Sequence, residues 1–231
     1  MAITTVTGDK HLLNATANGF TTTVDPFSIS VWINGTWNAA VASMVGVYGP
    51  VGTPTSAVQI GSRGDGRVSC WTWGGAILVS SVGTVVNGVW NHIVYTYDGT
   101  SHRLYVNGQL SNTTTTAPVA GQLAYVYVNG YPTGLANETA VYSVDSYAYY
   151  NYTLTPEEVL TQYSLQGARH GVVNGLVASY EFDELAEGST VIQITDLSGN
   201  ENHLTVAGAG VGNITHTYTG TVASSNLKMV Q

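Results

Sequence analysis

Residues 88–109 constrain the fold of this chain more than any other segment. Apolar and aromatic residues alternate with polar ones from Trp90 to Tyr97, as expected for a strand with one buried face. The pairs Asp98-Gly99 and Asn107-Gly108 follow, and both are dipeptides that favour tight hairpin turns. Two turns so close together leave no room for a helix, so the segment predicts consecutive antiparallel hairpins.

The composition is that of strands and turns. Of 231 residues, 27 are glycine and 20 are charged (6 Lys and Arg plus 14 Asp and Glu). Thr, Asn, Val and Tyr are plentiful, and β-branched and aromatic residues favour strands. Because all-β sandwiches often reach about 200 to 250 residues as one unit, we predict a single all-β domain.

The order W-N-H-I-V-Y-T-Y-D-G followed by L-Y-V-N-G resembles the central hairpins of laminin-G-like domains. These domains belong to the concanavalin A-like lectin/glucanase superfamily. Residues 27–33 (FSISVWI) are similar to the early strand of such domains, and residues 144–163 to their closing strand and short helix. The resemblance implies a jelly-roll sandwich of two antiparallel sheets with one short helix.

A third piece of the resemblance is displaced. Residues 175–184 (GLVASYEFDE) and 196–205 (DLSGNENHLT) resemble the segment that normally opens such a domain, yet here they come last. Either the sandwich is permuted, or this segment is donated to a neighbouring subunit. The predicted organisation is an N-terminal tail at residues 1–10, a laminin-G-like domain at 11–207 and a C-terminal tail at 208–231.

One helix is signalled directly. Thr155 is a suitable N-cap, Pro156 a suitable first helical residue, and Glu158 completes a capping box. Val159, Leu160 and Tyr163 form the predicted inward stripe. We expect this helix to close one end of the sandwich.

The charge excludes nucleic acid as a partner, and the residue pattern excludes a membrane-spanning helix. Binding nucleic acid needs clustered Lys or Arg, whereas this chain has a net charge of −8 and no run of arginines. No run approaches the roughly 20 apolar residues of a membrane span. Residues 1–10 lack the basic start and apolar core of a signal peptide, so we expect synthesis in a cytoplasm.

Catalysis is not expected. Related glucanases place their carboxylates at alternate positions of one strand in an E-x-D-x-x-E pattern, and that pattern is missing here. The acidic pair to consider is Glu181 and Asp183, which alternation would put on one face of a strand. Its resemblance to a non-catalytic segment favours a binding protein that requires no cofactor.

The acidic C-terminal region offers ligands for calcium. Ca²⁺ takes six to eight oxygens from carboxylates, amides and backbone carbonyls. Asp183, Asp196, Asn200 and Asn202 are the candidate ligands, and many laminin-G-like domains bind calcium at a loop rim. The alternative is that Asp and Asn in this turn bond to their own backbone without an ion.

Aromatic residues are the other candidate functional surface, because sugar rings stack on them. Three pairs share strand faces and are expected to fill the core: Trp71 with Trp73, Tyr125 with Tyr127, and Tyr147 with Tyr149. The loop aromatics Trp37, Tyr48 and Tyr131 are the predicted contacts with a ligand or partner.

A lectin-like sandwich with no export signal, one cysteine and almost no lysine suits a bacteriophage virion protein, made in the host cytoplasm and released by lysis. We predict a non-enzymatic virion-surface protein, such as a capsid decoration protein. Its extended tails would bind the major capsid protein or further copies of the chain. The alternative is an extracellular carbohydrate-binding module used in adhesion, with or without calcium.

Overall fold

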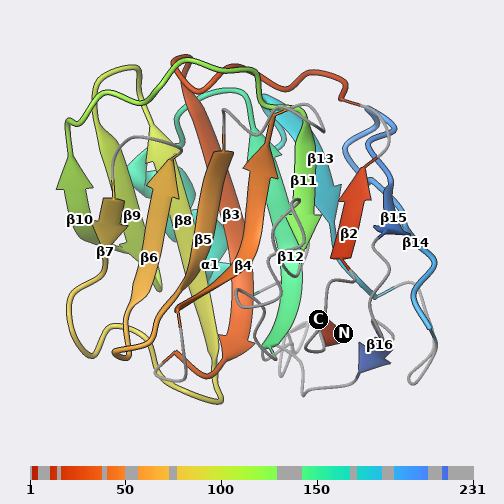
Figure 1. Cartoon of the computed structure of the whole chain (residues 1–231), viewed down its shortest axis with the longest axis horizontal. Helices are drawn as coiled ribbons and strands as arrows, with labels where there is room; N and C mark the ends of the chain where they lie inside the picture. The colour runs from red at the N-terminus through yellow and green to blue at the C-terminus, as the bar shows by residue number, and fades with distance from the viewer. Residues whose placement is uncertain are drawn as a thin grey trace, which may run out of the picture.

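The computed structural model describes residues 2–4, 11–14, 17–37, 41–49, 57–72, 77–128, 142–166, 171–183, 190–207 and 215–217. These residues form two antiparallel sheets packed face to face, with one helix outside them (Figure 1). The predicted all-β sandwich with one short helix is confirmed.

Sheet A lies behind sheet B in Figure 1 and contains eight strands in the described parts of the chain. In spatial order they are β10 (Gln109–Thr114), β9 (His102–Val106), β8 (Trp90–Tyr97), β3 (Phe27–Gly35), β12 (Tyr142–Tyr150), β1 (Ala2–Thr4) and β16 (Thr215–Thr217), with β13 (Leu176–Tyr180) also paired to β12. The hairpins predicted from residues 88–109 are β8–β9 and β9–β10. Asn107 and Gly108 have φ angles of 50° and 77°, which a tight hairpin turn requires.

Sheet B faces the viewer in Figure 1, and its described strands also number eight. In spatial order they are β14 (Gln193–Ile194), β15 (Leu204–Ala207), β2 (His11–Asn14), β11 (Tyr125–Val128), β4 (Val41–Tyr48), β5 (Ala57–Arg63), β6 (Val68–Thr72) and β7 (Ile77–Val79).

Alternate residues of facing strands fill the space between the sheets. Ile29 and Val31 of β3 belong to the same buried cluster as Val45 and Val47 of β4. Full burial of such a side chain contributes about 1.5–3 kcal/mol. Tyr147 and Tyr149 of β12 lie in this cluster as well, so the prediction that they fill the core is confirmed.

The C-terminal segment closes its own sandwich. Within residues 175–205, β13 pairs with β12 of sheet A, while β15 pairs with β2 of sheet B. The permuted arrangement is therefore the one that this chain adopts. Part of each predicted tail also enters sheet A, because β1 pairs with both β12 and β16.

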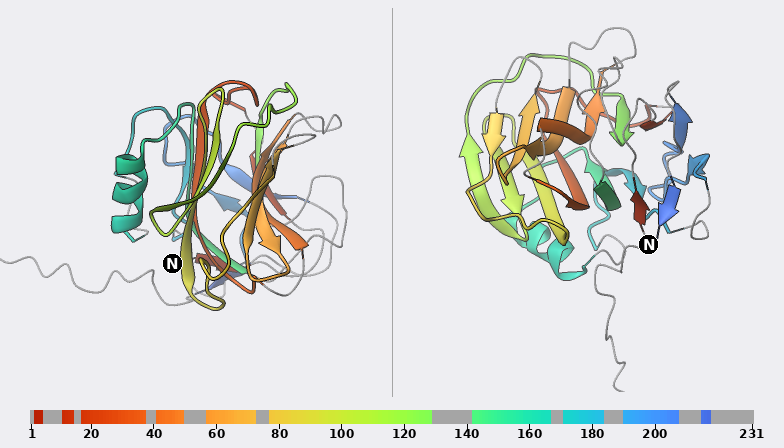
Figure 2. Two further views of the ribbon diagram at one scale, coloured as in Figure 1. Left: turned by 90° about the vertical axis from the view of Figure 1, so that its left-hand side faces the viewer. Right: turned by 60° about the horizontal axis from the view of Figure 1, so that its bottom comes forward.

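Helix α1 (Pro156–Ser164) begins as predicted at the N-cap Thr155, with both hydrogen bonds of the capping box present. It lies flat on the outer face of sheet A rather than at one end of the sandwich (Figure 2, left). Val159 is buried as expected, but Leu160 faces solvent and Gln162 is buried instead, where its amide donates to the hydroxyl of Tyr150. No helix in the described ranges is long and apolar enough to cross a membrane.

Candidate functional site

The outer face of sheet B carries a cluster of tyrosines. Val47 of β4 and Val126 of β11 face the core, so Tyr48, Tyr125 and Tyr127 point to the opposite face of the sheet. The rings of Tyr48 and Tyr127 meet edge to face, with centroids 4.8 Å apart and planes at 73°. Burial, and then the neighbouring Tyr125, raises the pKa of Tyr127 to about 12. Its hydroxyl therefore stays protonated at neutral pH.

A line of residues in register crosses this face from strand to strand. Tyr127 on β11 pairs with Gly46 on β4, which pairs with Gln59 on β5. Gln59 in turn pairs with Trp71 on β6. We call these four residues the cross-strand row. Because neighbouring strands lie about 4.8 Å apart, Tyr127 and Trp71 are separated by roughly 14 Å along the row.

Glycine is required at position 46 by the close packing of the tyrosines. A Cβ atom there would lie 2.6 Å from the carbonyl oxygen of Val58 and 2.9 Å from Cε2 of Tyr48. Both distances are shorter than a carbon can tolerate without movement of the neighbour. Gly46 thus allows the ring of Tyr48 to lie over the strand.

Gln59 is the unusual polar member of the row. Val58 and Ile60 face the core on either side of it, so its side chain lies on the outer face. The residue is 2% exposed, and its Oε1 has no hydrogen-bond partner in the described parts of the chain. A buried acceptor without a donor costs about 1–3 kcal/mol of stability.

The three predicted contact residues have different outcomes. Trp37 is fully buried in the core cluster, so its prediction as an exposed loop aromatic is wrong. The chain turns inward after β3, and the backbone N–H of Trp37 donates to Oδ1 of Asn87 at 2.7 Å. Tyr48 is also not a loop residue, since it ends β4 and is 1% exposed. It nevertheless belongs to the outer-face cluster. Tyr131 lies outside the described residues.

Other members of this face were expected to be core residues. Tyr127 is buried, but in a second apolar cluster with Tyr48 on the outer face of sheet B rather than between the sheets. Tyr125 and Trp71 lie on the same face and are only half-buried, so the expectation is wrong for them. Trp73 is outside the described residues. The sequence contains the relevant signal, because Val126 and Val128 alternate with the tyrosines and are the better core residues.

Asp196 is the centre of a hydrogen-bonded turn. Its Oδ1 accepts from the N–H groups of Ser179 and Ser198, each at 2.9 Å. Its Oδ2 accepts from the Ser198 hydroxyl at 2.8 Å and from the Asn202 N–H at 2.9 Å. Both carboxylate oxygens are therefore already bonded to donors, as the backbone-capping alternative predicts.

The side-chain amides of two other predicted calcium ligands donate to groups other than Asp196. The amide nitrogens of Asn200 and Asn202 donate to the Val177 carbonyl at 3.1 and 2.9 Å, and Asp183 is exposed. In the described residues, no three His, Cys, Asp or Glu side chains are grouped as metal ligands. Calcium here stays a prediction, and a bound ion would have to displace the donors on Asp196.

The acidic pair considered for hydrolysis does not have the expected geometry. Strand β13 ends at Tyr180, and Phe182 has a φ of 52°, so Glu181 and Asp183 do not share one strand face. Glu181 is buried near Asp145, another buried acid. Burial, together with repulsion from Glu181, raises the pKa of Asp145 to about 8.

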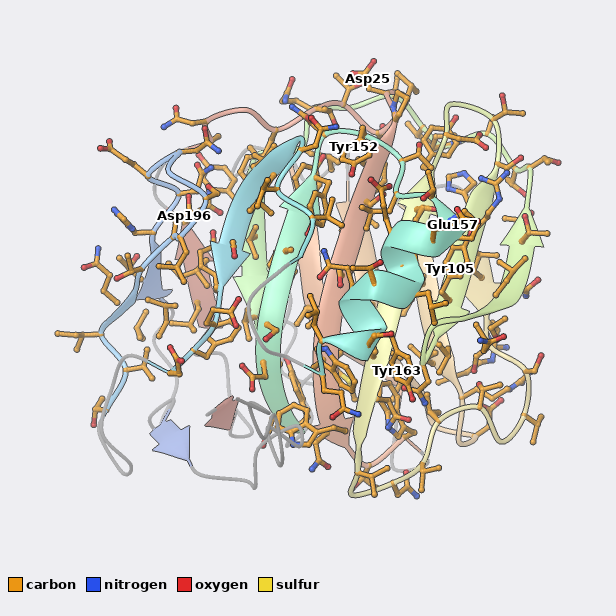
Figure 3. All side chains as sticks on the ribbon, turned by 180° about the vertical axis from the view of Figure 1, so that it is seen from behind. Asp25, Tyr105, Tyr152, Glu157, Tyr163 and Asp196 are labelled. Carbon is orange, nitrogen blue, oxygen red and sulfur yellow. The ribbon has the colours of Figure 1, made fainter. Side chains whose placement is uncertain are left out.

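A shallow groove of about 390 Å³ lies on the other side of the molecule. It separates α1 from the β9–β10 hairpin and is lined by Tyr105, Gly108, Gln109, Leu110, Pro156, Glu157 and Leu160. Figure 3 shows Tyr105 and Glu157 together at this groove, with Asp196 near the opposite edge of the molecule. The groove and the Asp196 turn are thus separate features.

The strand order and the packed sheets define this protein as a jelly-roll sandwich of the lectin type. A laminin-G family model, described as "Concanavalin A-like lectin/glucanases superfamily", matches residues 7–160. This match covers more than half of the chain, so the protein belongs to that superfamily. No curated protein matches the sequence.

Several solved structures share the fold. A candidate carbohydrate-binding protein from Bacteroides ovatus is 15% identical with a TM-score of 0.63, over 90% of this chain and 62% of that protein. A heptameric SAP-like pentraxin from Limulus polyphemus is 14% identical with a TM-score of 0.54, over 93% and 96% of the two chains. The binding domain of botulinum neurotoxin serotype G is 12% identical with a TM-score of 0.52, over 72% and 47%. The chain spans less than two thirds of the first and third structures, and the likeness concerns the fold alone.

Proposed function

We propose that this protein is a non-enzymatic, lectin-type carbohydrate-binding module whose ligand lies on the outer face of sheet B. The observation that carries the proposal is the cross-strand row, in which an amide side chain stands between two aromatic residues. Aromatic rings stack on the apolar C–H faces of sugars, and Trp71 and Tyr125 reach solvent on this face. The carbohydrate-binding description of the Bacteroides ovatus protein supports this choice.

Exposure divides the face into a floor and a rim. Tyr48, Tyr127 and Gln59 are shielded and form the floor, whereas Tyr125 and Trp71 are half-buried and reach solvent. A glycan would therefore stack on Trp71 or Tyr125, which reach solvent, while the shielded floor residues hold these rings in place. Binding outside the cell, in adhesion, is the setting that this proposal favours.

The test is glycan-array binding by the full chain and by two tryptophan variants. Trp71→Ala removes a rim ring, and Trp90→Ala removes a half-buried tryptophan from the other sheet as the matched control. We expect binding to be lost in Trp71→Ala and kept in Trp90→Ala, with both variants folded by circular dichroism. A full chain that binds no glycan on the array would overturn the proposal.

The predicted role on a bacteriophage virion concerns different partners, and it stays a prediction. Its test is the mass of the native assembly by light scattering, with and without residues 208–231. A tail-dependent oligomer that binds purified capsids would favour the virion role, whereas a monomer that binds glycans would favour the module proposed here.

A further inference from the structure

We infer that the Asn174-Gly175 dipeptide, in the turn that leads into β13, is a site of spontaneous deamidation whose isoaspartate product weakens the segment that closes the sandwich. The modification concerns sheet A and does not depend on glycan binding. The sequence contains six Asn-Gly dipeptides, which begin at Asn18, Asn34, Asn87, Asn107, Asn129 and Asn174. Asn129 lies outside the described residues, so the structure allows the other five to be compared.

Asparagine followed by glycine reacts readily because glycine has no side chain to shield its backbone nitrogen. That nitrogen loses its proton to base and attacks Cγ of the asparagine. The bond from Cγ to the side-chain nitrogen breaks, and ammonia leaves. Water then opens the five-membered succinimide at either carbonyl, which gives aspartate or isoaspartate. The reaction consumes one water and involves no oxidation, and it requires a side chain that can turn toward an unshielded glycine nitrogen.

Two of the five described dipeptides are held by contacts with distant parts of the chain. The side-chain amide of Asn18 donates to the carbonyl of Asn200 at 2.9 Å. Asn34 lies within β3, where it is paired with β8 on one side and with β12 on the other. Either dipeptide must lose these contacts before it can reach the geometry of the reaction.

Two further dipeptides lie in turns, but their side chains are bonded to the backbone of other segments. Oδ1 of Asn87 accepts from the N–H of Trp37 at 2.7 Å. Oδ1 of Asn107 accepts from the N–H of His92 at 2.8 Å. These bonds keep the reacting Cγ atom of each asparagine in place.

Asn174 differs from these four asparagines. It is exposed, and no hydrogen bond in the described parts of the chain engages its side chain or the N–H of Gly175. A single bond closes its turn, from the N–H of Leu176 to the carbonyl of Val173 at 3.3 Å. Ordinary N–H···O bonds measure about 2.7–3.2 Å, so this bond is weak. Both reacting groups are therefore available after little local opening.

Glycine at position 175 is required by the fold, which keeps the reactive dipeptide in place. Its φ angle is 62°, in the region that favours glycine. A Cβ atom there would lie 2.5 Å from Cδ1 of Tyr152 and 2.7 Å from Oδ1 of Asn151. A test of the site must therefore change Asn174 and not Gly175.

The product alters the start of β13. Either form lowers the net charge of −8 by one unit, and isoaspartate also adds one methylene carbon to the backbone. The carbonyl of Gly175 accepts from the N–H of Asn151 at 2.9 Å, and Leu176 pairs with Tyr150 of β12. A longer backbone directly before these contacts displaces them, so isoaspartate should hold β13 less firmly than asparagine does.

The experiment follows the full chain during incubation in its folded state and, in parallel, unfolded in concentrated urea. Peptide mapping with mass spectrometry measures aspartate and isoaspartate at each Asn-Gly site. Asn174→Gln is the test variant, because the longer side chain closes its ring much more slowly. Asn112→Gln, at an exposed asparagine that no glycine follows, is the matched control. Freshly prepared Asn174→Asp carries the charge without the extra carbon.

In the folded chain we expect Asn174 to react at least about tenfold faster than the other four described sites, because each of those must first lose a contact. In urea the five rates should converge. The thermal midpoint should fall during incubation of the unchanged chain and of Asn112→Gln but not of Asn174→Gln, and Asn174→Asp should melt close to the fresh protein.

Equal rates at the five sites of the folded chain, or faster reaction at one of the other four, would overturn the assignment of the site. A faster reaction of Asn174 that persisted unchanged in urea would show that the local sequence, and not the fold, is the cause. If the midpoint of Asn174→Gln fell as much as that of the unchanged chain, deamidation at this turn would not weaken the sandwich. None of these results bears on glycan binding.

Discussion

The hydroxyl of Ser146 donates a hydrogen bond of 3.0 Å to Oε2 of Glu181, at the point where β12 changes its partner strand from β1 to β13. Ser146 and Phe182 have φ angles of 46° and 52°, a region that non-glycine residues rarely occupy. The bond thus joins two strained segments, each beside a buried carboxyl group, Asp145 in one and Glu181 in the other. Stability at this junction should depend on protonation.

The first prediction concerns Asp145. Burial and the nearby Glu181 raise its pKa from 3.8 to about 8, so the folded state binds a proton more tightly than the unfolded state. Stability contributed by this group is present at low pH and is lost as pH rises from about 4 to about 8. Asp145→Asn keeps an oxygen to accept from the Ser146 N–H.

We expect Asp145→Asn to raise the thermal midpoint at about pH 8 and to change it little at about pH 4, measured by circular dichroism. A midpoint increase of the same size at both pH values would show that titration of Asp145 is not the cause.

The second prediction concerns the pair Tyr95 and His102. The His102 Nε2–H donates to the Thr116 carbonyl at 2.9 Å, which leaves Nδ1 to accept from the Tyr95 hydroxyl at 2.5 Å. Tyr95→Phe leaves that buried nitrogen without its donor and should cost about 1–3 kcal/mol. Tyr97→Phe is the control, because Tyr97 stacks on the same imidazole at 4.3 Å through its ring. Denaturant unfolding of both variants distinguishes hydrogen bonding from stacking, and equal losses would contradict the assignment.

His102 should also make the fold sensitive to acid. Burial lowers its pKa below 6.5, so the unfolded state binds the proton more readily, and stability falls as pH drops below about 6.5. Asp145 acts in the opposite direction over an overlapping range. The loss is therefore best measured in the Asp145→Asn background, where a midpoint that does not fall between about pH 6.5 and pH 5 would refute it.

The third prediction concerns calcium at Asp196. Because N–H and O–H donors already occupy both carboxylate oxygens, we expect added calcium or a chelator to leave the thermal midpoint unchanged. Asp196→Ala should lower the midpoint by removing these bonds, with or without calcium. A calcium-dependent rise that disappears in Asp196→Ala would establish the ion site instead.

The fourth prediction concerns Gly46. Its replacement by Ala brings a methyl group against the Val58 carbonyl and the Tyr48 ring, which should cost about 1–3 kcal/mol by overpacking. Displacement of Tyr48 should also weaken glycan binding. Ser69→Ala, at a buried position of β6, two strands away in the same sheet, is the control. If Gly46→Ala retained both stability and affinity, the tyrosine cluster would not depend on this close approach.

Local sequence patterns predicted the turns and the start of the helix well, because interactions between residues close in sequence produce these features. The Asn107-Gly108 turn and the capping box at Thr155 are short-range hydrogen-bonding and backbone preferences, and both occur as expected. The alternation of residues wrongly predicted the position of Glu181 on a strand face, because β13 ends at Tyr180 and Phe182 has a left-handed φ angle. The position where β13 ends depends on its pairing with β12, a strand distant in sequence, so no local sequence pattern predicts it.

By itself, the sequence determined that this chain forms strands, where its tightest turns lie, where its helix begins and which superfamily it belongs to. Alternation separates the two faces of a strand, but it does not say which face meets the other sheet. Only the tertiary structure decided that Trp37 lies in the core whereas Tyr48, Tyr127 and Trp71 lie on the outer face of sheet B. The physical reason is that register between strands, set by long-range pairing and by burial of the valines, brings Gly46 and Gln59 between those rings.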